Sequence, residues 1–393
     1  MKKLLIFLDE LYYKKNDSYI SSYAAGSFFY ELISVEKSYL LPVSINNNSI
    51  PESPSTQINA QKHTVFDLPE WHSTISYLNL MVKSVKMRKK VREQIDLAIQ
   101  LNDIFWIRFP SLAGLQLIKR ALKENKKVLI HHAGDIENAW KVKKYYGVKK
   151  LWAFLLSKYM HRSIQKLAKH PNTWHFCTGS KVYTNIKKQN KQTHFFIDSR
   201  VKVKELNNHK FDINTKRFVF VGKFIEGKGI LDLLDIFNEL SENHNNLELK
   251  IIGFGELESL IQQKIANSNF PNTFNYIGPV ANKNINQYLQ TSDILVFPSK
   301  IRTEGFPRVI IEAWAQSLVV ISNKIGGIEG LAIDQKNILF SETEDLMSLK
   351  KNIESIIIGQ ADINKMQEYI VNNRSNITYE FYLNLLEKTI NGL

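Results

Sequence analysis

Two glutamates, Glu304 and Glu312, are the side chains in this sequence whose types and spacing point most directly to chemistry. Glu304 follows the apolar segment 294–299, which is typical of a buried strand. Glu312 lies within a predicted helix that begins near Pro307. One carboxylate should therefore lie in a loop and the other on a helix whose first N–H groups are free to bind an anion. This arrangement suits a ligand that carries both hydroxyl groups and negative charge.

Glu312 also has an ordinary interpretation, because Arg308 lies four residues earlier on the same predicted helix. A surface pair of this kind stabilises a helix by only about 0.3–0.5 kcal/mol. Ile310 and Trp314, two positions away on either side, should face the core, so Glu312 should point towards a cleft or solvent.

A second candidate site is the segment from Gly222 to Gly229, which ends a predicted strand and begins a predicted helix. Its two lysines, Lys223 and Lys228, are five residues apart. Their charges, together with the N–H groups at the helix start, can neutralise a diphosphate. The alternative is a pair of solvated surface lysines, but cations without an anion are mildly unfavourable at the positive end of a helix dipole.

Short apolar runs alternate with longer amphipathic stretches, a pattern typical of α/β folds with parallel sheets. A polar stretch at residues 201–214 separates two such series. We therefore expect two doubly wound Rossmann-like domains facing a central cleft, over residues 1–205 and 206–375. Residues 376–393 should form a C-terminal helix that packs back towards the first domain.

The predicted strands set the position of any site, because ligands of such sheets bind at the carboxyl ends of strands. In the first half we expect strands at residues 4–8, 39–43, 104–107, 127–131 and 174–178, and a loop at 44–62. In the second half glycines follow the predicted strands in register, at Gly222, Gly253 and Gly255, Gly278, Gly305, and Gly326 with Gly327.

The charge of the chain is concentrated in its first half. Residues 1–200 hold 32 Lys and Arg against 15 Asp and Glu, whereas residues 201–393 hold 20 against 23. This asymmetry predicts an anionic partner for the first half: nucleic acid, phospholipid or a phosphorylated substrate. The single cysteine, Cys177, fits a reducing compartment. No apolar run is long enough to span a membrane, and the short run after Met1 predicts a buried strand and not an export signal.

The ordered motifs of the second half resemble the nucleotide-sugar-binding domain of retaining GT-B glycosyltransferases, family 4 (glycosyl transferases group 1). The resemblance covers about residues 217–345. It is carried by segments 218–223, 228–229, 251–255, 276–280 and 292–299, by Glu304-Gly305-Phe306-Pro307, by Ile311-Glu312-Ala313 and by Gly326-Gly327. Two positions depart from the family: Lys223 stands where Arg is usual, and Ser317 stands where Gly is usual.

The resemblance implies a role for each matching residue. Glu304 would contact the donor sugar, Gly305 and Phe306 would offer backbone N–H groups, and Glu312 would hold the ribose hydroxyls. Lys228 and Lys223 would bind the diphosphate and, with Glu304, form the catalytic group. The other expected donor-binding residues are Gly222, Gly253, Gly255, Ile277 and Pro307.

No cofactor or metal is expected, because the sequence has no Asp-x-Asp motif at the expected position and fixed cations can stabilise a leaving diphosphate. The family retains the anomeric configuration, which implies a front-face attack in which the leaving phosphate helps to take the acceptor proton.

The first half should bind the acceptor. Arg108 resembles the strand-end Arg-x-Pro-Ser of some members, and His131 and His132 end the next predicted strand. The resemblance implies a functional histidine in this domain in many members, whereas a histidine at a strand end is otherwise often only a hydrogen-bonded structural residue. Asp135 could equally cap the following helix. Gly26 belongs to a segment that we interpret as an acceptor loop.

Residues 140–191 combine many lysines with Trp, Tyr, Phe and Leu and contain few acids. This composition suits an anionic membrane surface, although a well-solvated basic helix is equally compatible with it.

Together these features predict a cytoplasmic, peripherally membrane-associated bacterial enzyme. It would transfer a sugar from a UDP- or GDP-sugar to a hydroxyl of a lipid-linked or polysaccharide acceptor in surface glycan synthesis. One alternative is another enzyme of the same architecture, a sugar-nucleotide epimerase or a phosphorylase. The other is a basic nucleic-acid-binding protein, but no nucleic-acid partner is expected because no recognised module accompanies the charge.

Overall fold

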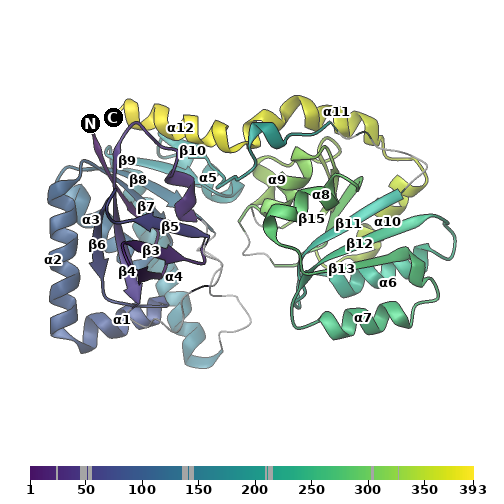
Figure 1. The fold of residues 1–393 in the computed structure, drawn as a ribbon, viewed down its shortest axis with the longest axis horizontal. Helices are drawn as coiled ribbons and strands as arrows, with labels where there is room; N and C mark the ends of the chain where they lie inside the picture. The colour runs from purple at the N-terminus through teal and green to yellow at the C-terminus, as the bar shows by residue number, and fades with distance from the viewer. Residues whose placement is uncertain are drawn as a thin grey trace. The chain divides into compact units, whose positions relative to one another are not determined.

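Two β-sheets organise the chain, one in each of two units (Figure 1). The first unit comprises residues 1–198 and 383–393, and the second comprises residues 199–382. The structure is a computed structural model that describes residues 1–23, 25–44, 51, 55–134, 140, 146–208, 210, 216–301, 305–325 and 327–393. Both sheets are mainly parallel and alternate with helices along the chain, so the expected α/β class with two Rossmann-like units is confirmed.

The first unit contains a ten-stranded sheet in the order β10-β9-β8-β7-β1-β4-β2-β3-β5, with β6 also paired to β4. Its strands are β1 (Lys3–Phe7), β2 (Tyr12–Lys15), β3 (Ser18–Ser21), β4 (Glu36–Ser44), β5 (Thr56–Asn59), β6 (Thr64–Leu68), β7 (Ile104–Phe109), β8 (Lys127–His132), β9 (Thr173–Cys177) and β10 (Thr193–Phe195). Its helices are α1 (Thr74–Lys83), α2 (Val85–Leu101), α3 (Leu112–Lys123), α4 (Gly147–Ala168) and α5 (Ser180–Lys187).

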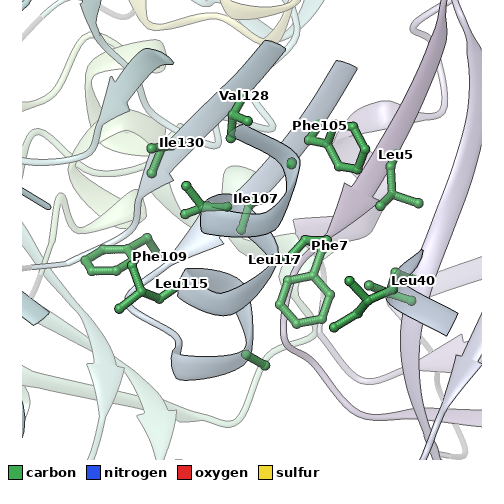
Figure 2. Packing of buried hydrophobic residues seen from close by; sticks show 14 of the residues in the cluster. Leu5, Phe7, Leu40, Phe105, Ile107, Phe109, Leu115, Leu117, Val128 and Ile130 are labelled. Carbon is green, nitrogen blue, oxygen red and sulfur yellow. The ribbon is translucent and has the colours of Figure 1, made fainter. Parts of the chain in front are cut away.

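Alternate residues of the central strands build the core of this unit. Side chains on one face of β1, β7 and β8 pack with Leu115 and Leu117 of α3, as Figure 2 shows. These strand residues are all buried: Leu5, Phe7, Phe105, Ile107, Phe109, Val128 and Ile130. The intervening residues, among them Trp106 and His131, face the opposite side of the sheet, because successive side chains of a strand alternate.

The second unit contains a six-stranded parallel sheet in the order β13-β12-β11-β14-β15-β16. Its strands are β11 (Lys216–Lys223), β12 (Leu247–Phe254), β13 (Phe274–Gly278), β14 (Ile294–Phe297), β15 (Val319–Asn323) and β16 (Ile338–Ser341). Its helices are α6 (Ile230–Leu240), α7 (Glu258–Ala266), α8 (Ile285–Leu289), α9 (Arg308–Ala315), α10 (Leu346–Ile357) and α11 (Ile363–Asn373), and α12 (Tyr379–Asn391) follows them.

The units divide at residue 198 and not at 205, because the segment after Ser199 is hydrogen-bonded to the second unit. Tyr379 N donates to Val201 O, and Asn207 N donates to Ala315 O. Ser317, at the position where the family usually has glycine, adopts a positive φ of 66°. Its hydroxyl donates to Asn207 O at 2.6 Å, which anchors the segment at a position that strains a non-glycine backbone.

The sequence prediction located the central strands but missed six others. The expected loop at residues 44–62 contains β5, and β2, β3, β6, β10 and β16 were not expected. Most of these strands have three to five residues and belong to the outer parts of the sheets, so they carry too few apolar residues to show a clear period.

Candidate active site

The strand order of the second sheet marks one point where a ligand is expected. The chain runs outward from β11 through β12 to β13, and then returns to begin again at β14 on the other side of β11. In open α/β sheets, ligands bind outside the carboxyl ends of the strands at such a switch point. The two candidate segments of this unit, Gly222–Gly229 and the stretch after Phe297, follow β11 and β14 respectively.

Glycines allow the backbones at the ends of β11 and β12 to approach closely. Gly222 is paired with Gly253 in the strand register, and each is the second-to-last residue of its strand. A Cβ atom added to Gly253 would lie 1.8 Å from Gly222 O, and its φ of 153° disfavours any side chain. Gly255 has a similar φ, of 152°. This edge therefore presents backbone rather than side chains.

The loop that carries the two candidate lysines is fixed by hydrogen bonds to both neighbouring loops. Phe224 N donates to Phe254 O at 2.8 Å, and Lys300 N donates to Gly227 O at 2.7 Å. Gly229 precedes α6 with a φ of 74°, and a Cβ atom there would lie 2.4 Å from Pro298 O. The loop thus reaches α6 by passing directly over the end of β14.

Lys223 and Lys228 differ in how they are held. Lys223 is the last residue of β11 and its side chain is exposed. Lys228 is half-buried, and its Nζ lies 5.1 Å from the centre of the Phe297 ring at the end of β14. Contact with the aromatic face positions this ammonium at the switch point. The two cations and the backbone of the loop can together receive a diphosphate.

The segment before α9 lies in the next loop, after β14. Glu304 lies outside the described residues, whereas Gly305, Phe306 and Pro307 lead directly into α9, which begins at Arg308 as expected. The Phe306 ring is buried, 5.8 Å from the Trp314 ring centre to centre. With its side chain in the core, Phe306 has only backbone groups to offer a ligand.

Glu312 lies on α9, between the buried residues Ile311 and Ala313, and is itself half-buried. Burial raises the pKa of its carboxyl, while the charges of Arg308 and Arg200 oppose that rise. A carboxylate that has lost part of its hydration is stabilised by hydrogen bonds from hydroxyl groups, such as those of a sugar. Arg200 was not found from the sequence, because it lies more than a hundred residues away in the connecting segment.

The first sheet has its own switch point, between β1 and β7. Here Glu10, which follows β1, is buried, and its Oε1 accepts a hydrogen bond from Nη1 of Arg108 on β7 at 2.6 Å. In the described part of the chain, the second carboxylate oxygen, Oε2, has no hydrogen-bond partner. Burial raises the pKa of Glu10 to about 7, with Arg108 opposing and Asp198 and Asp9 adding to the rise.

Arg108 was predicted from the sequence, but its partner Glu10 and the neighbouring Asp9 were not. Asp9 accepts a hydrogen bond from Trp71 Nε1 at 2.7 Å, and burial raises its pKa. The signal was available, because both acids directly follow a predicted buried strand at the edge where ligands bind.

His131 and His132 are both buried inside the first unit. The His131 ring lies among Trp106 and Phe196, and its Nε2 is 3.1 Å from Thr178 Oγ1. His132 Nε2 is 2.9 Å from Nδ1 of the buried His175. Burial lowers the pKa of His131 to about 3 and that of His132 well below its usual value, so both rings are neutral at physiological pH. Each ring thus has a structural environment and a hydrogen-bonding partner within the core.

The remaining predicted residues are dispersed. Gly26 lies in a short 3-10 helix against β5, where a Cβ atom would lie 2.6 Å from Thr56 Cγ2, so close packing requires a glycine there. Asp135 lies outside the described residues. Ile277 is half-buried on β13, two strands away from the switch point.

Across the described ranges, no group of three or more His, Cys, Asp and Glu side chains is arranged to hold a metal ion. Over the same ranges, no helix combines the length and the apolar composition that crossing a membrane requires.

The family model described as "Glycosyl transferases group 1" matches residues 202–375, which is nearly all of the second unit. Among curated proteins, the chain is 24% identical over 268 residues to the amylovoran biosynthesis glycosyltransferase AmsK of Erwinia amylovora. That alignment covers 66% of this chain and 63% of AmsK. A second relative, the uncharacterized glycosyltransferase MJ1178 of Methanocaldococcus jannaschii, is 30% identical over 139 residues, which cover 35% of this chain and 37% of MJ1178. The chain therefore spans less than two thirds of the length of either relative.

Solved structures with the same fold cover the whole chain. Anabaena Alr3699/HepE in complex with UDP has a TM-score of 0.63 at 13% identity, with 100% of both chains covered. The lipopolysaccharide outer core galactosyltransferase WaaB, in its apo form, has a TM-score of 0.66 at 13% identity, with 99% of both chains covered. These likenesses confirm the expected GT-B class for the two Rossmann-like units.

Proposed function

We propose that the protein is a glycosyltransferase with a UDP- or GDP-sugar donor, because the family model for glycosyl transferases group 1 matches residues 202–375. It would transfer the sugar, with retention of configuration, to a hydroxyl of a lipid-linked or polysaccharide acceptor in bacterial surface glycan synthesis. The observation that carries the proposal is the backbone-lined edge at the β11–β14 switch point, where Lys228 is held over Phe297.

The donor would be bound mainly through its diphosphate. The glycine pair Gly222 and Gly253 lets the two strand ends pack closely without side chains between them, and Lys223 and Lys228 supply two positive charges in the loop that follows. The half-buried carboxylate of Glu312 would accept hydrogen bonds from the ribose hydroxyls, which offset its lost hydration. Glu304 would contact the sugar.

In the reaction, the bond between the anomeric carbon and the diphosphate oxygen breaks as the acceptor oxygen attacks from the same face. Negative charge then develops on the leaving nucleoside diphosphate, and the fixed ammonium groups of Lys228 and Lys223 stabilise it without a metal ion. The leaving phosphate takes the proton of the acceptor hydroxyl, so retention needs no protein base at the anomeric carbon.

The acceptor would bind to the first unit, at the β1–β7 switch point. Arg108 is half-exposed and paired with the buried Glu10, whose Oε2 has no partner among the described residues. Arg108 would donate hydrogen bonds to sugar hydroxyls, and the buried Glu10 would hold its guanidinium in place. His131 and His132 would support the fold of this edge from within the core. The enzyme would work in the cytoplasm, on the inner face of the plasma membrane.

Two relatives support the proposed nucleotide-sugar donor and the proposed role in polysaccharide synthesis. The structure of HepE contains UDP, and AmsK is a glycosyltransferase of amylovoran biosynthesis. The proposal for this protein applies the same chemistry: a nucleoside diphosphate as the leaving group and a surface glycan as the product.

The testing experiment measures thermal stability in the presence of UDP, GDP and ADP, because a ligand that binds only the folded state raises the melting temperature. We expect UDP or GDP to stabilise the protein, with or without EDTA. The matching sugar nucleotide would then be used in transfer assays, and NMR would identify the anomer formed.

Three results would count against the proposal. Stabilisation by none of the nucleotides, together with steeply salt-dependent RNA binding, would favour the nucleic-acid alternative. Conversion of a UDP-sugar without any acceptor would favour an epimerase. Loss of activity in EDTA that returns on adding Mg²⁺ would contradict metal independence.

A further inference from the structure

The N-terminal half of α4 has no buried residue, although the rest of the helix is packed. Its buried residues are Ser157, Met160, Ser163, Ile164, Leu167 and Ala168, all in the C-terminal half. From Gly147 to Leu156 every residue is exposed or half-buried, and Leu156 alone packs partly against the core cluster of the unit. In this half of the 22-residue helix, therefore, no side chain is fully buried, although Phe154 packs against the Trp140 ring at 5.2 Å between ring centres.

An apolar stripe runs along this half of α4 and ends one turn beyond it, at Tyr159. Large side chains recur at intervals of three and four residues, which places them along one face of a helix. Each is between 49% and 71% exposed: Val148, Leu151, Trp152, Leu155 and Tyr159. We refer to these five residues as the α4 stripe. Contiguous apolar surface of this kind on a soluble unit marks an interaction site.

The charge around the α4 stripe identifies the occupant. Lys149, Lys150, Lys158 and Arg162 lie between or next to its members, and no Asp or Glu occurs anywhere in residues 146–197. The Lys149 ammonium lies 5.9 Å from the ring centre of the exposed Tyr146, and that of Lys158 lies 5.7 Å from the ring centre of Phe154. Aromatic and aliphatic side chains interleaved with cations match the headgroup region of an anionic bilayer.

A second exposed apolar row lies on the same side of the unit. Ile75, Leu78 and Val82 of α1 are exposed at helical spacing. Leu80 and Met81 of α1 pack against the same core cluster as Leu156 of α4, so both helices cover one face of the sheet. In Figure 1 α1 and one end of α4 lie at the same end of this unit.

We propose that the α4 stripe, together with the exposed row of α1, docks the first unit onto an anionic lipid surface. Leu151, Trp152 and Leu155 would insert at the level of the headgroups, and Lys149 and Lys150 would contact lipid phosphates. The purpose of this docking, access to a lipid-linked acceptor, rests on the proposed function. The docking itself needs neither donor nor acceptor and can be measured separately.

The experiment uses the full chain and vesicles of phosphatidylcholine with or without phosphatidylglycerol. We expect co-sedimentation with the anionic vesicles and little with the neutral ones. Leu151→Ser with Leu155→Ser should lower the partition coefficient at least about tenfold, because insertion strength follows the buried apolar area. Met347→Ser is the matched control, since Met347 is 71% exposed on α10 of the second unit, and it should bind as the unchanged protein does.

Two further variants separate docking from a loss of fold. Trp152→Phe keeps the apolar volume, so it should still bind, but quenching of tryptophan fluorescence by spin-labelled lipid should fall sharply. Lys149→Gln with Lys150→Gln should reduce the preference for anionic over neutral vesicles severalfold, whereas Lys351→Gln on α10 should not.

The proposal is overturned if the unchanged protein does not bind anionic vesicles, or if the stripe variants bind as it does. It is also overturned if the stripe is covered by a second copy of the chain, which sedimentation would reveal as a dimer that the stripe variants abolish. Thermal stabilisation by UDP or GDP, measured on the same variants, tests the proposed function independently. Lost vesicle binding with an intact nucleotide response would support the docking surface, and vesicle binding without any nucleotide response would leave it standing while the proposed function fails.

Discussion

The two switch points of this molecule are built on the same topology and filled in opposite ways. At the ends of β11, β12 and β14, Gly222, Gly253 and Gly229 allow neighbouring backbones to pack closely, and Lys223 and Lys228 lie in the same loop. At the end of β1 and β7 a buried carboxylate, Glu10, meets the guanidinium of Arg108. One edge presents backbone, and the other presents charged side chains.

The two edges are therefore suited to different kinds of ligand. A diphosphate is the same in every nucleotide sugar, and N–H groups with fixed cations are sufficient to bind it. Acceptors differ in the positions of their hydroxyls, and under the proposed function Arg108, held in place by Glu10, would discriminate among them because an unmatched buried polar group is costly. Four predictions test the contrast, in order of decreasing effect.

The largest effect is expected from a methyl group at the glycine edge. In Gly253→Ala the new Cβ would lie 1.8 Å from Gly222 O at a φ of 153°, so the strand ends must separate. We expect a loss of several kcal/mol in the free energy of unfolding, or no folded second unit. Gly134→Ala, after β8 of the first unit, has no atom within 4 Å of the new Cβ and should stay within about 0.5 kcal/mol. Urea unfolding measures the free energy of unfolding of both variants. Equal losses in the two would show that the backbone packing at Gly253 has no special role.

The second prediction concerns Glu304, which we propose contacts the donor sugar. Glu304→Ala should lower kcat for sugar transfer by about a hundredfold or more, the size of effect seen when a group that acts on the transition state is removed. Circular dichroism and melting temperature should be unchanged. Glu368→Ala, an exposed carboxylate on α11, serves as the control. Full activity in the Glu304 variant would exclude the family role for this residue.

The third prediction concerns pH and the acidic edge. The pKa of Glu10 is raised from 4.5 to about 7 in the folded protein, so the folded state holds this proton more tightly than the unfolded state. Stability should therefore fall as pH rises between these two values, by roughly 2 kcal/mol from about pH 5 to about pH 7. Glu10→Gln removes the titrating carboxyl, so the fall in the free energy of unfolding between these pH values should be smaller by roughly 2 kcal/mol.

Urea unfolding of both proteins across this pH range measures the difference in slope, from which other titrating groups largely cancel. The Gln variant also leaves Arg108 without its charged partner, which shifts the whole profile but not its slope. Parallel profiles for the two proteins would show that Glu10 does not titrate in this range.

The smallest effect is expected when the lysines proposed to bind the diphosphate are replaced. Lys228→Ala should weaken binding of the preferred nucleoside diphosphate about tenfold, the loss of roughly 1.4 kcal/mol. Lys223→Ala should cost less, because Lys223 is exposed whereas Lys228 is held over Phe297. Isothermal calorimetry measures both, with the exposed Lys351→Ala on α10 as control. Unchanged affinity in the Lys228 variant would remove it from the diphosphate site.

Much of the donor edge was predictable because its signals are local. The strand at β14, the start of α9 near Pro307 and the glycines at the ends of β11 and β12 follow from apolar runs and from the residues that interrupt them. The structure adds the reason for the glycines: Gly253 and Gly229 stand where Cβ atoms would collide with neighbouring backbone.

The edge at the ends of β1, β7 and β8 was less predictable because its contacts join residues that are distant in sequence. His131 and His132 end a strand, as predicted, but alternation along β8 sends their rings to opposite buried faces. The Glu10–Arg108 pair joins residues 98 positions apart and depends on β1 lying next to β7. No spacing along the chain reports such a pairing.

Three features were readable from the amino-acid sequence: the alternation of strands and helices, the Lys223–Lys228 loop and the basic character of the first half. Each of these depends on neighbours in the chain, on backbone preference or on composition. Three others became visible only in the folded chain: Lys228 lies over Phe297, Glu10 is buried against Arg108, and α4 exposes an apolar stripe. The reason is that burial and pairing depend on which strands and helices become neighbours, and sheet order is set by packing across the whole unit.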